Sequence, residues 1–393
     1  MSLSKISEKF VLNKLKLIKN GNLKLVNYDG KVYHFGDLEN LFTAEIKVIN
    51  PKFYLNIILG GSSALGEAHI NKDFYSKNLT NLIELTARNI KIIYSFSGSV
   101  KLQTIKNVLK RIFASNTKSN SLEYISKHYD LGNEFFSNWL DKSLTYSSAI
   151  YEDNNNDLEI AQKNKYQKLI DLLHLKNGNK ILEIGCGWGG FSEYLAKNYD
   201  VIIDCITISK KQFEYTKKRI FKNGLNNKVN VMFLDYRDLK DKYDKVASIE
   251  MIEAVGENYL DQYFRTIKKS LKPEGYAAIQ GITIRDDLFN RYRNSEDFIQ
   301  KYIFPGGFLP SLNQIKQISK NNKLNLEKIN SYSGDYAKTL SSWRNNFLNA
   351  WDNIAPLGFD DYFKRMWEFY LSYCEAGFKA KNIDLIQFSM SNR

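Results

Sequence analysis

The sequence predicts an α/β protein, with a doubly wound parallel sheet in its carboxyl-terminal part and a smaller α+β domain before it. Three observations support this prediction. Strand and helix patterns alternate from residue 180 to residue 284, short β-prone runs fill residues 24–59, and polar residues 115–121 separate the two patterns. With 393 residues, of which 43% are hydrophobic, the chain is long enough to form two domains with buried cores.

The amino-terminal part begins with β-prone runs that alternate with Asp-Gly and Gly-Asp turn signals, which predicts a small antiparallel sheet. The runs are KLVNYDG, KVYHF, AEIKVI and KFYLNIIL. Residues 60–111 have a more helical pattern, and apolar positions from Val100 to Phe113 share one face with lysines around it. That face fits a helix packed on its own domain or a helix at a membrane surface. We place the domain boundary in the polar stretch, giving domains 1–115 and 116–393.

The carboxyl-terminal part contains apolar strand patterns separated by amphipathic helix patterns. The strands are KILEI, VIIDCITI, KVNVMFL, KVASIEM and YAAIQGITI, and the helices are FSEYLAKNY, KKQFEYTKKRIFKN and YLDQYFRTIKKSL. This alternation is typical of a Rossmann-like sheet covered by helices on both faces, with its ligand at the carboxyl ends of the strands.

Charge is concentrated near the amino terminus. Residues 1–120 hold 18 Lys and Arg against 8 Asp and Glu, a formal +10 of the total +13. Such a domain could meet nucleic acid or anionic lipid, and a lysine-rich solvated surface would give the same count. Three distant cysteines, an amino terminus with interspersed lysines, and the lack of a long apolar stretch favour a reducing cytoplasm over secretion or membrane insertion.

A glycine-rich loop follows the first strand of the larger domain. Gly185, Gly187 and Gly190 satisfy G-x-G-x-x-G, which also occurs in dinucleotide-binding proteins. The next strand ends without the acidic residue that would hold a ribose, since Asp204 lies inside it. Glu183, two positions before the first glycine, resembles instead the acidic residue of the E/D-x-G-x-G motif of class I methyltransferases. S-adenosylmethionine is therefore the expected cofactor, and the four scattered histidines predict no metal site.

Further segments resemble, in order and spacing, the cyclopropane-fatty-acyl-phospholipid synthase family. They are HYDLGN (128–133), LTYSSA (144–149), ITISKKQ (206–212), SIEMIEAVG (248–256), YIFPGG (302–307) and YCEAGF (373–378), with GGSSALGEA (60–68) in the amino-terminal domain. The resemblance covers nearly the whole chain. It implies an S-adenosylmethionine-dependent C-methyltransferase of the longer, phospholipid-acting form, whose amino-terminal domain contacts lipid.

The resemblance also implies roles for single residues around the cofactor. They are Tyr146 and Ser147 at the methionine part, Glu183, Gly185 and Gly187 in the backbone cradle, Thr207 and Gln212 at the ribose, and Tyr236 and Arg237 at the adenine.

For catalysis the resemblance implies bicarbonate as the base, bound by Ser148, Glu253, Gln280 and Tyr336, with Cys374 nearby. An isolated cis double bond attacks a sulfonium methyl only by forming a carbocation. A small anion beside that cation stabilises it and accepts its proton.

Three positions depart from the family pattern. Ser148 stands where a cysteine is usual, Gln280 where a histidine is usual, and Ala254 follows Glu253 in place of a histidine. These departures bear on the product. Loss of a proton from the transferred methyl closes a cyclopropane, whereas a hydride shift before proton loss leaves a methylene-branched chain. We expect the cyclopropane and keep the methylene-branched fatty acid as the alternative.

The expected partners are membrane phospholipids with unsaturated acyl chains and an anionic membrane surface, approached as a peripheral protein from the cytoplasmic, inner face. The oligomeric state stays open, a homodimer included. Nucleic acid is not expected, because no Pro-Pro-Tyr-like acceptor motif follows the fourth strand. A nicotinamide-dependent oxidoreductase and a lipid-binding protein with a decayed site are the more distant alternatives.

Overall fold

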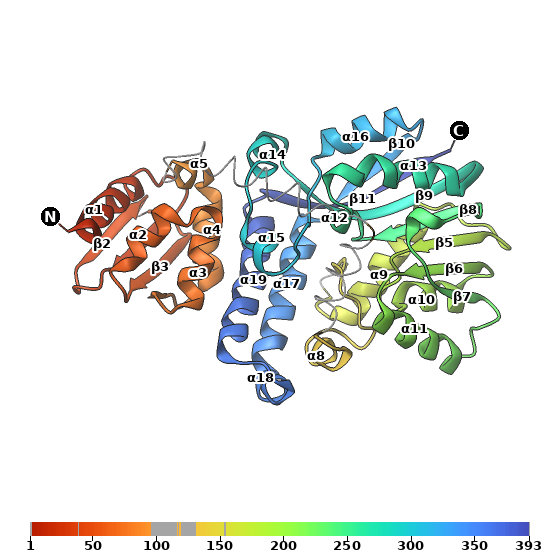
Figure 1. Cartoon of the computed structure of the whole chain (residues 1–393), viewed down its shortest axis with the longest axis horizontal. Coiled ribbons are helices and arrows are strands. Elements are labelled where there is room, and N and C mark those ends of the chain that lie inside the picture. Colours follow the sequence, from red (N-terminus) through yellow and green to blue (C-terminus); the bar gives the residue numbers. More distant parts are fainter. Residues whose placement is uncertain are drawn as a thin grey trace. The chain divides into compact units, whose positions relative to one another are not determined.

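The computed structural model describes residues 2–37, 39–95, 116, 118, 131–152 and 155–392. The chain divides into two compact units, each built from more than one segment (Figure 1). The first comprises Met1–Lys110, Arg291–Ile303 and Trp351–Asn382, and the second comprises Arg111–Asn290, Phe304–Ala350 and Ile383–Arg393. The predicted helix Val100–Phe113 and the boundary after residue 115 lie outside the described residues, so the division into 1–115 and 116–393 stays a prediction.

The sheet of the first unit has four strands in the order β2-β1-β3-β4. The strands are β1 (Asn22–Val26), β2 (Val32–Gly36), β3 (Thr43–Val48) and β4 (Phe74–Tyr75). Strand β1 pairs antiparallel with β2 but parallel with β3. The prediction of a small antiparallel sheet is therefore wrong for the β1–β3 pair, because the segment between β2 and β3 carries the chain back to the other side of β1.

One predicted strand of the first unit is a helix. The run KFYLNIIL forms α2 (Lys52–Leu59), which packs on α1 (Leu3–Leu15). Pro51 precedes it with φ −60° and ψ −19°, a conformation that starts a helix. A short apolar run is ambiguous between a buried strand and a buried helix, and here the proline and the burial of Phe53 and Tyr54 decide for the helix.

Helices from distant parts of the chain complete the first unit. They are α3 (Ala64–Ile70), α4 (Leu79–Arg88), α5 (Ile90–Tyr94), α15 (Phe298–Tyr302), α18 (Trp351–Ile354) and α19 (Asp361–Lys379). Helix α19 packs on α3 and α4. Gly66 on α3 permits close packing against α15 and α19, since a Cβ there would lie 2.3 Å from the ring of Phe298 and 2.7 Å from the ring of Phe369. No pattern in the sequence predicts that residues 291–303 and 351–382 belong with the first unit.

The second unit is built on a seven-stranded sheet with the order β10-β11-β9-β8-β5-β6-β7. The strands are β5 (Lys180–Ile184), β6 (Ile202–Thr207), β7 (Val229–Phe233), β8 (Tyr243–Ile249), β9 (Leu271–Ile284), β10 (Asn325–Ser331) and β11 (Ile383–Ser391). Strands β5 to β9 pair in parallel, which confirms the predicted doubly wound sheet. Strands β10 and β11 extend it antiparallel.

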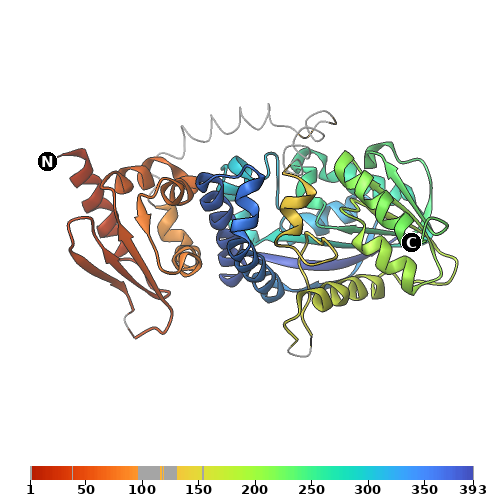
Figure 2. The ribbon, with the colours of Figure 1, turned by 90° about the horizontal axis from the view of Figure 1, so that it is seen from below.

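Helices accompany this sheet in the order expected for a doubly wound fold (Figures 1 and 2). They are α8 (Asn133–Ser137), α9 (Leu158–Asp171), α10 (Gly190–Asn198), α11 (Lys210–Lys222), α12 (Ile252–Val255), α13 (Leu260–Ser270), α14 (Asp286–Tyr292), α16 (Leu312–Asn321) and α17 (Ser333–Asn349). Apolar side chains of α9, α10, β5 and β6 form one buried core, exemplified by Leu169, Leu195, Ile181 and Ile203. In the described part of the chain, no helix is both long and apolar enough to cross a membrane.

Candidate active site

The glycine-rich loop lies at the carboxyl end of β5. Gly185, Gly187 and Gly189 have φ values of 84°, 52° and 81°, which favour glycine. The backbone N–H groups of Gly185 and Cys186 donate to the carbonyl of Ile206, both at 3.0 Å, so the neighbouring strand fixes the start of the loop. A Cβ on Gly187 would meet no atom within 4 Å. The loop thus leaves open space beside Gly187, as a backbone cradle for a ligand requires.

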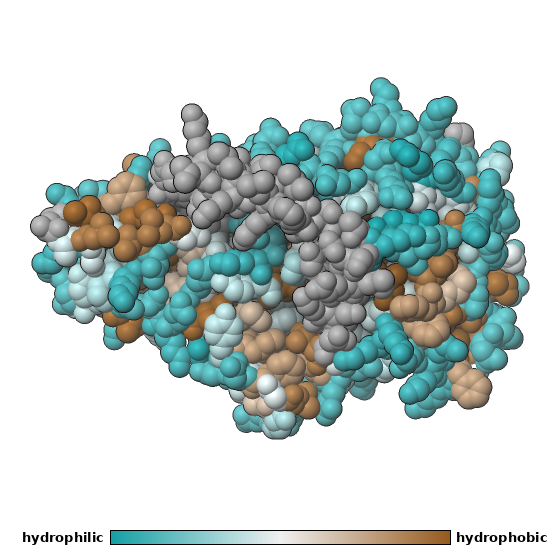
Figure 3. Space-filling view, viewed as in Figure 1, coloured by the Kyte–Doolittle hydropathy of each residue, from teal (hydrophilic) through white to brown (hydrophobic). Residues whose placement is uncertain are grey.

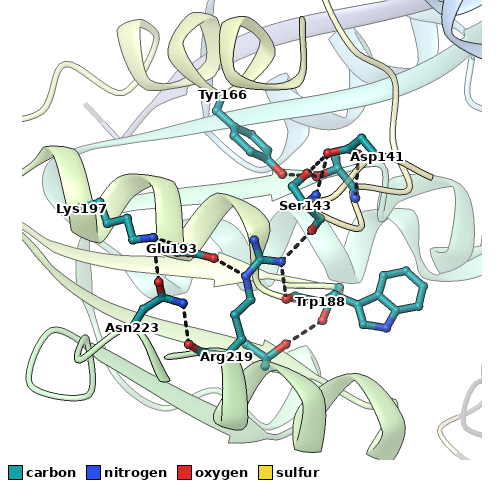
Figure 4. Close-up of polar contacts among 11 residues, drawn as sticks. Asp141, Ser143, Tyr166, Trp188, Glu193, Lys197, Arg219 and Asn223 are labelled. Atoms are coloured by element: carbon teal, nitrogen blue, oxygen red, sulfur yellow. Dashed lines mark hydrogen bonds and ion pairs between the residues drawn. The ribbon is translucent and has the colours of Figure 1, made fainter. Parts of the chain in front are cut away.

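Arg219, which was not predicted from the sequence, contacts this loop and the segments around it (Figure 4). Arg219, on α11, donates to the carbonyls of Trp188 at 3.1 Å and Ser143 at 2.6 Å, and it forms an ion pair with Glu193. Figure 4 shows these contacts converging from three segments of the chain. Arg219 therefore ties the glycine loop to the segment that precedes Tyr146.

Glu183 occupies the end of β5 and is buried. Its carboxylate accepts a hydrogen bond from the hydroxyl of Ser192 on α10. Burial raises its pKa to about 7. Glu183 thus anchors the start of α10 behind the loop, and direct contact with a cofactor stays a prediction.

Thr207 and Gln212 lie together where β6 meets α11. The hydroxyl of Thr207 donates to the side-chain carbonyl of Gln212 at 3.0 Å, and both residues are buried. The side chain of Ser209 caps α11 by accepting from the backbone of Gln212. Strands β5 and β6 are neighbours in the sheet, so the structure brings this predicted ribose pair to the same edge as the glycine loop.

Tyr236 and Arg237 follow β7 in a short 3-10 turn. The guanidinium of Arg237 binds Asp235 through two hydrogen bonds of 2.8 and 2.6 Å, and it donates to the carbonyl of Asn116 at 3.0 Å. Burial alone would raise the pKa of Asp235, but the bonds from Arg237 outweigh it and lower that pKa. Tyr236 packs edge-on against Tyr263. Their contact with adenine stays a prediction.

Tyr146 and Ser147 adjoin a buried lysine that the sequence did not reveal. Tyr146 lies in an aromatic cluster with Phe136 and Trp343, at ring-centroid distances of 5.3 and 5.4 Å. The hydroxyl of Ser147 accepts a hydrogen bond of 2.6 Å from the ammonium group of Lys165 on α9. Lys165 is fully buried, and burial lowers its pKa to about 7.

Three hydrogen bonds converge on the carboxylate of Glu250, which sequence reasoning did not select. Its Oε1 accepts from the backbone N–H of Ser148 and from the side-chain amide of Gln280, both at 2.8 Å. Its Oε2 accepts from the hydroxyl of Tyr336 at 2.6 Å. Burial raises the pKa of Glu250, and these three donors oppose that rise.

Gln280 links this carboxylate to the rest of the sheet. Its side-chain carbonyl accepts from Gln387 on β11 at 2.9 Å, and Gln387 also donates to the carbonyl of Lys165 at 3.2 Å. Gln280 and Gln387 face each other in the β9–β11 register. The orientation of the Gln280 amide, with its N–H₂ toward Glu250, is therefore fixed by this network.

Glu253 lies on α12, one turn beyond Glu250. Its Oε1 accepts from the backbone N–H of Ile282 at 2.5 Å. Its Oε2 is buried and has no hydrogen-bond partner among the described residues. Burial, followed by the negative charge of Glu250, raises the pKa of Glu253 to about 8. The structure thus gives Glu253 one oxygen that a bound group could use.

Cys374, the last predicted site residue, lies on α19 in the first unit. Burial, with a smaller contribution from the charge of Asp297, raises the pKa of its thiol. The thiol is therefore protonated at neutral pH. The structure brings the other four predicted catalytic residues into the second unit, and a place for Cys374 beside them stays a prediction.

A signal for Glu250 does exist in the sequence. It directly follows β8, and in a parallel sheet the residue after a central strand faces the ligand edge. An ionisable residue at this position is a candidate site residue even without a resemblance to a known family. No comparable signal in the sequence points to Lys165, Arg219 or Gln387, because each contacts site residues that are distant from it in the sequence.

A comparison with known families identifies the chain. The family model described as "Mycolic acid cyclopropane synthetase" matches residues 116–388. The chain belongs to this family. It is 36% identical to the cyclopropane-fatty-acyl-phospholipid synthase of Escherichia coli (strain K12) over 357 residues, which cover 88% of each chain. It is 34% identical to the tuberculostearic acid methyltransferase UfaA1 of Mycobacterium tuberculosis, covering 84% of this chain and 79% of that one.

Solved structures of the family have the same fold. The cyclopropane synthase MmaA2 from Mycobacterium tuberculosis matches with a TM-score of 0.65 at 27% identity, covering 69% of this chain and 98% of that one. The mycolic acid cyclopropane synthase CmaA1, complexed with SAH and CTAB, matches with a TM-score of 0.65 at 26% identity and the same coverage. The chain is an S-adenosylmethionine-dependent C-methyltransferase of the cyclopropane synthase family, which confirms the predicted family, fold and enzyme class.

Proposed function

We propose that this enzyme adds a methylene group from S-adenosylmethionine to the cis double bond of unsaturated acyl chains in membrane phospholipids, forming a cyclopropane ring. The observation that carries this proposal is the extent of the similarity. It runs along 88% of the E. coli phospholipid synthase and of this chain. The solved structures of MmaA2 and CmaA1 cover only 69% of this chain. The part beyond them is available to contact a phospholipid.

The glycine loop fits the cofactor. Gly185 and Gly187 have φ values that favour glycine, and a side chain on Gly187 would fill the open space beside the loop. Tyr146, Ser147, Thr207 and Gln212 would hold the remaining parts of the molecule. When bound, S-adenosylmethionine supplies an electrophilic methyl carbon that the double bond attacks, leaving a cation on the neighbouring acyl carbon.

The chain's own residues would then protect and deprotonate this cation. The aromatic side chains around Tyr146 exclude water, which would otherwise capture the cation. The negative charge that stabilises it and the base that removes its proton come from an oxyanion at Ser148, Gln280 and Tyr336. The family resemblance names bicarbonate for this role. The carboxylate of Glu250 already receives hydrogen bonds from these three residues.

The lipids of a bacterium that lacks its own synthase provide the test. After expression of this chain, mass spectrometry should show a gain of one methylene group per unsaturated acyl chain, and cells with an empty vector should show none. A cyclopropane and a methylene branch have the same mass, so mild hydrogenation separates them: only the methylene branch takes up hydrogen. Uptake of hydrogen by the product would favour the methylene-branched alternative. Unchanged lipids would contradict the proposed acceptor.

For the membrane partner, helix α1 offers a specific surface. Leu3, Ile6 and Phe10 are 63%, 49% and 38% exposed at helical spacing, next to the exposed lysines Lys5 and Lys9. Figure 3 shows apolar side chains gathered at the surface over α1. Apolar residues flanked by lysines are typical of a helix that lies in a lipid interface. We propose that α1 helps this basic region bind anionic membranes, which would place the enzyme peripherally on the inner face.

Vesicle sedimentation tests this surface. Binding to anionic vesicles should exceed binding to neutral vesicles and weaken as salt rises, since each suitably placed basic residue contributes roughly 1 kcal/mol. The pair Ile6→Ser and Phe10→Ser should weaken binding at every salt concentration. Phe221→Ser is the matched control, because Phe221 is 76% exposed but lies on α11 in the second unit. Equal binding to neutral and anionic vesicles would contradict the proposal. Light scattering of the purified protein without vesicles tests the homodimer.

A further inference from the structure

Three of the four residues expected to hold a bicarbonate ion, all except Glu253, donate to a side chain of the protein instead. The backbone of Ser148, the amide of Gln280 and the hydroxyl of Tyr336 converge on the two carboxylate oxygens of Glu250, at 2.8, 2.8 and 2.6 Å. They come from a loop, from β9 and from α17. Bicarbonate could bind the same donors only by displacing Glu250.

We propose that Glu250 is the base of the reaction and that its carboxylate replaces free bicarbonate at this site. The inference rests on the proposed function for the identity of the acceptor. Like bicarbonate, a carboxylate offers two equivalent oxygens with about four acceptor positions. Three of them receive the donors described above. One acceptor position is left for a proton from the substrate.

The surrounding groups keep Glu250 ionised in a defined orientation. The N–H of Ser148 and the N–H₂ of Gln280 can only donate, so they favour the carboxylate over the carboxylic acid. The backbone N–H of Glu250 donates to the carbonyl of Gln280 at 2.8 Å. The titratable groups nearby are Lys165, whose positive charge lowers the pKa of Glu250, and Glu253, whose pKa is raised to about 8 by burial and by the charge of Glu250.

The backbone of Glu250 also points to a functional role. Its φ is +49°, in the left-handed region that glycine adopts more readily. Strained non-glycine residues cluster at functional sites, where the side chain is needed in spite of its conformation. The side chain of Glu250 is half-buried, so part of it remains accessible to a ligand.

The chemical step balances without any added reactant. After methyl transfer, the acyl chain carries a cation next to the newly methylated carbon. An oxygen of Glu250 accepts a proton from the new methyl group, so that a C–H bond breaks and an O–H bond forms. The electron pair of the broken bond forms the third bond of the ring and neutralises the cation. Glu250, now a neutral carboxylic acid, releases its proton to water, and each turnover liberates one proton.

The experiment compares purified wild-type enzyme with Glu250→Gln and Glu250→Gly, on vesicles of unsaturated phospholipid, in CO₂-free buffer with and without added bicarbonate or formate. Wild-type turnover should not depend on bicarbonate. Glu250→Gln should lose about 10² to 10⁴-fold in turnover, the scale for losing a general base, while it binds S-adenosylmethionine as the wild type does. Glu250→Gly frees the three donors, so added bicarbonate or formate should restore part of its turnover.

The matched controls are Glu274→Gln and Glu274→Gly. Glu274 is an exposed glutamate with φ +59°, so they repeat the same chemical and backbone changes away from the site. They should keep wild-type turnover. Two results would overturn the inference: wild-type turnover that disappears without bicarbonate and returns with it, or a Glu250→Gln enzyme that keeps more than about a tenth of wild-type turnover. Wild-type enzyme that methylates no unsaturated phospholipid under any condition would instead contradict the proposed acceptor.

Discussion

The glycine loop and the carboxylate cluster around Glu250 lie at the same edge of one sheet but are assembled differently. The loop is set by backbone geometry within a few residues and by two hydrogen bonds to Ile206. The cluster is assembled by the backbone N–H of Ser148 and by the side chains of Gln280 and Tyr336, which are distant in sequence. The loop is therefore a local property of the chain, whereas the cluster depends on strand register and on helix α17.

The largest expected effect is a loss of cofactor affinity when a side chain fills the open space beside the glycine loop. Gly187→Leu places a side chain in the open space beside the loop. Affinity for S-adenosylmethionine should fall by at least about 1000-fold, or ~4 kcal/mol, and calorimetry would measure the loss. Gly224→Leu is the matched control, because Gly224 also has a positive φ and open space but follows α11. Equal losses in both variants would mean that backbone strain, and not the cradle, is responsible.

At the carboxylate cluster, Tyr336→Phe should separate binding from chemistry. It removes the hydroxyl that donates to Oε2 of Glu250 and leaves the ring against Trp343. Turnover should fall by about 100-fold, the scale for one preorganised donor, with cofactor affinity unchanged. Tyr332→Phe, one helical turn earlier, is the control and should retain turnover. A Tyr336→Phe enzyme with reduced cofactor affinity would place Tyr336 on the cofactor side of the site.

The difference between the two regions also explains what could be predicted from sequence. The parallel sheet β5–β9 and the loop after β5 follow from hydrophobic alternation and glycine spacing, both of which are local. The approach of Gln280 to Glu250 requires the β8–β9 register, in which Ile249 lies opposite Gln280. Periodicity does not specify that register. The family resemblance points to Glu253, three residues away, and not to Glu250.

The same distinction applies to the first unit. KFYLNIIL is apolar over its whole length, so its period could not distinguish strand from helix, and the structure shows α2. Residues 351–382 join this unit through packing of α19 on α3 and α4, contacts that link positions roughly 300 residues apart. Contacts between such distant segments leave no pattern in the local sequence.

A smaller effect is expected at Glu253. Glu253→Gln keeps an oxygen for the N–H of Ile282 but removes the ionisable carboxyl group, whose Oε2 has no hydrogen-bond partner among the described residues. If Oε2 helps to stabilise the cation, turnover should fall by about 10 to 100-fold with little change in cofactor affinity. Glu257→Gln, at the start of the following 3-10 turn, serves as the control. Unchanged turnover in Glu253→Gln would leave Glu250 as the carboxylate that acts on the substrate.

The smallest effect concerns pH and tests how the two regions are coupled through Lys165. A base must be ionised, so turnover should fall as pH drops through the pKa of Glu250, which burial raises and Lys165 lowers. Lys165 donates to Ser147, a predicted cofactor contact, while its charge acts on Glu250. Lys165→Met removes that charge, so the acidic limb of the pH–rate profile should move to higher pH.

Lys163→Met is the matched control for this shift, because Lys163 lies on the same helix but forms an exposed ion pair with Glu159. Its profile should coincide with that of the wild type. The same limb should be absent from the residual activity of Glu250→Gln, since no carboxylate remains there to titrate. An acidic limb that persists in Glu250→Gln and does not move in Lys165→Met would report the titration of another group. In that case the charge of Lys165 would not act on the base, and Lys165 would affect it only through its position.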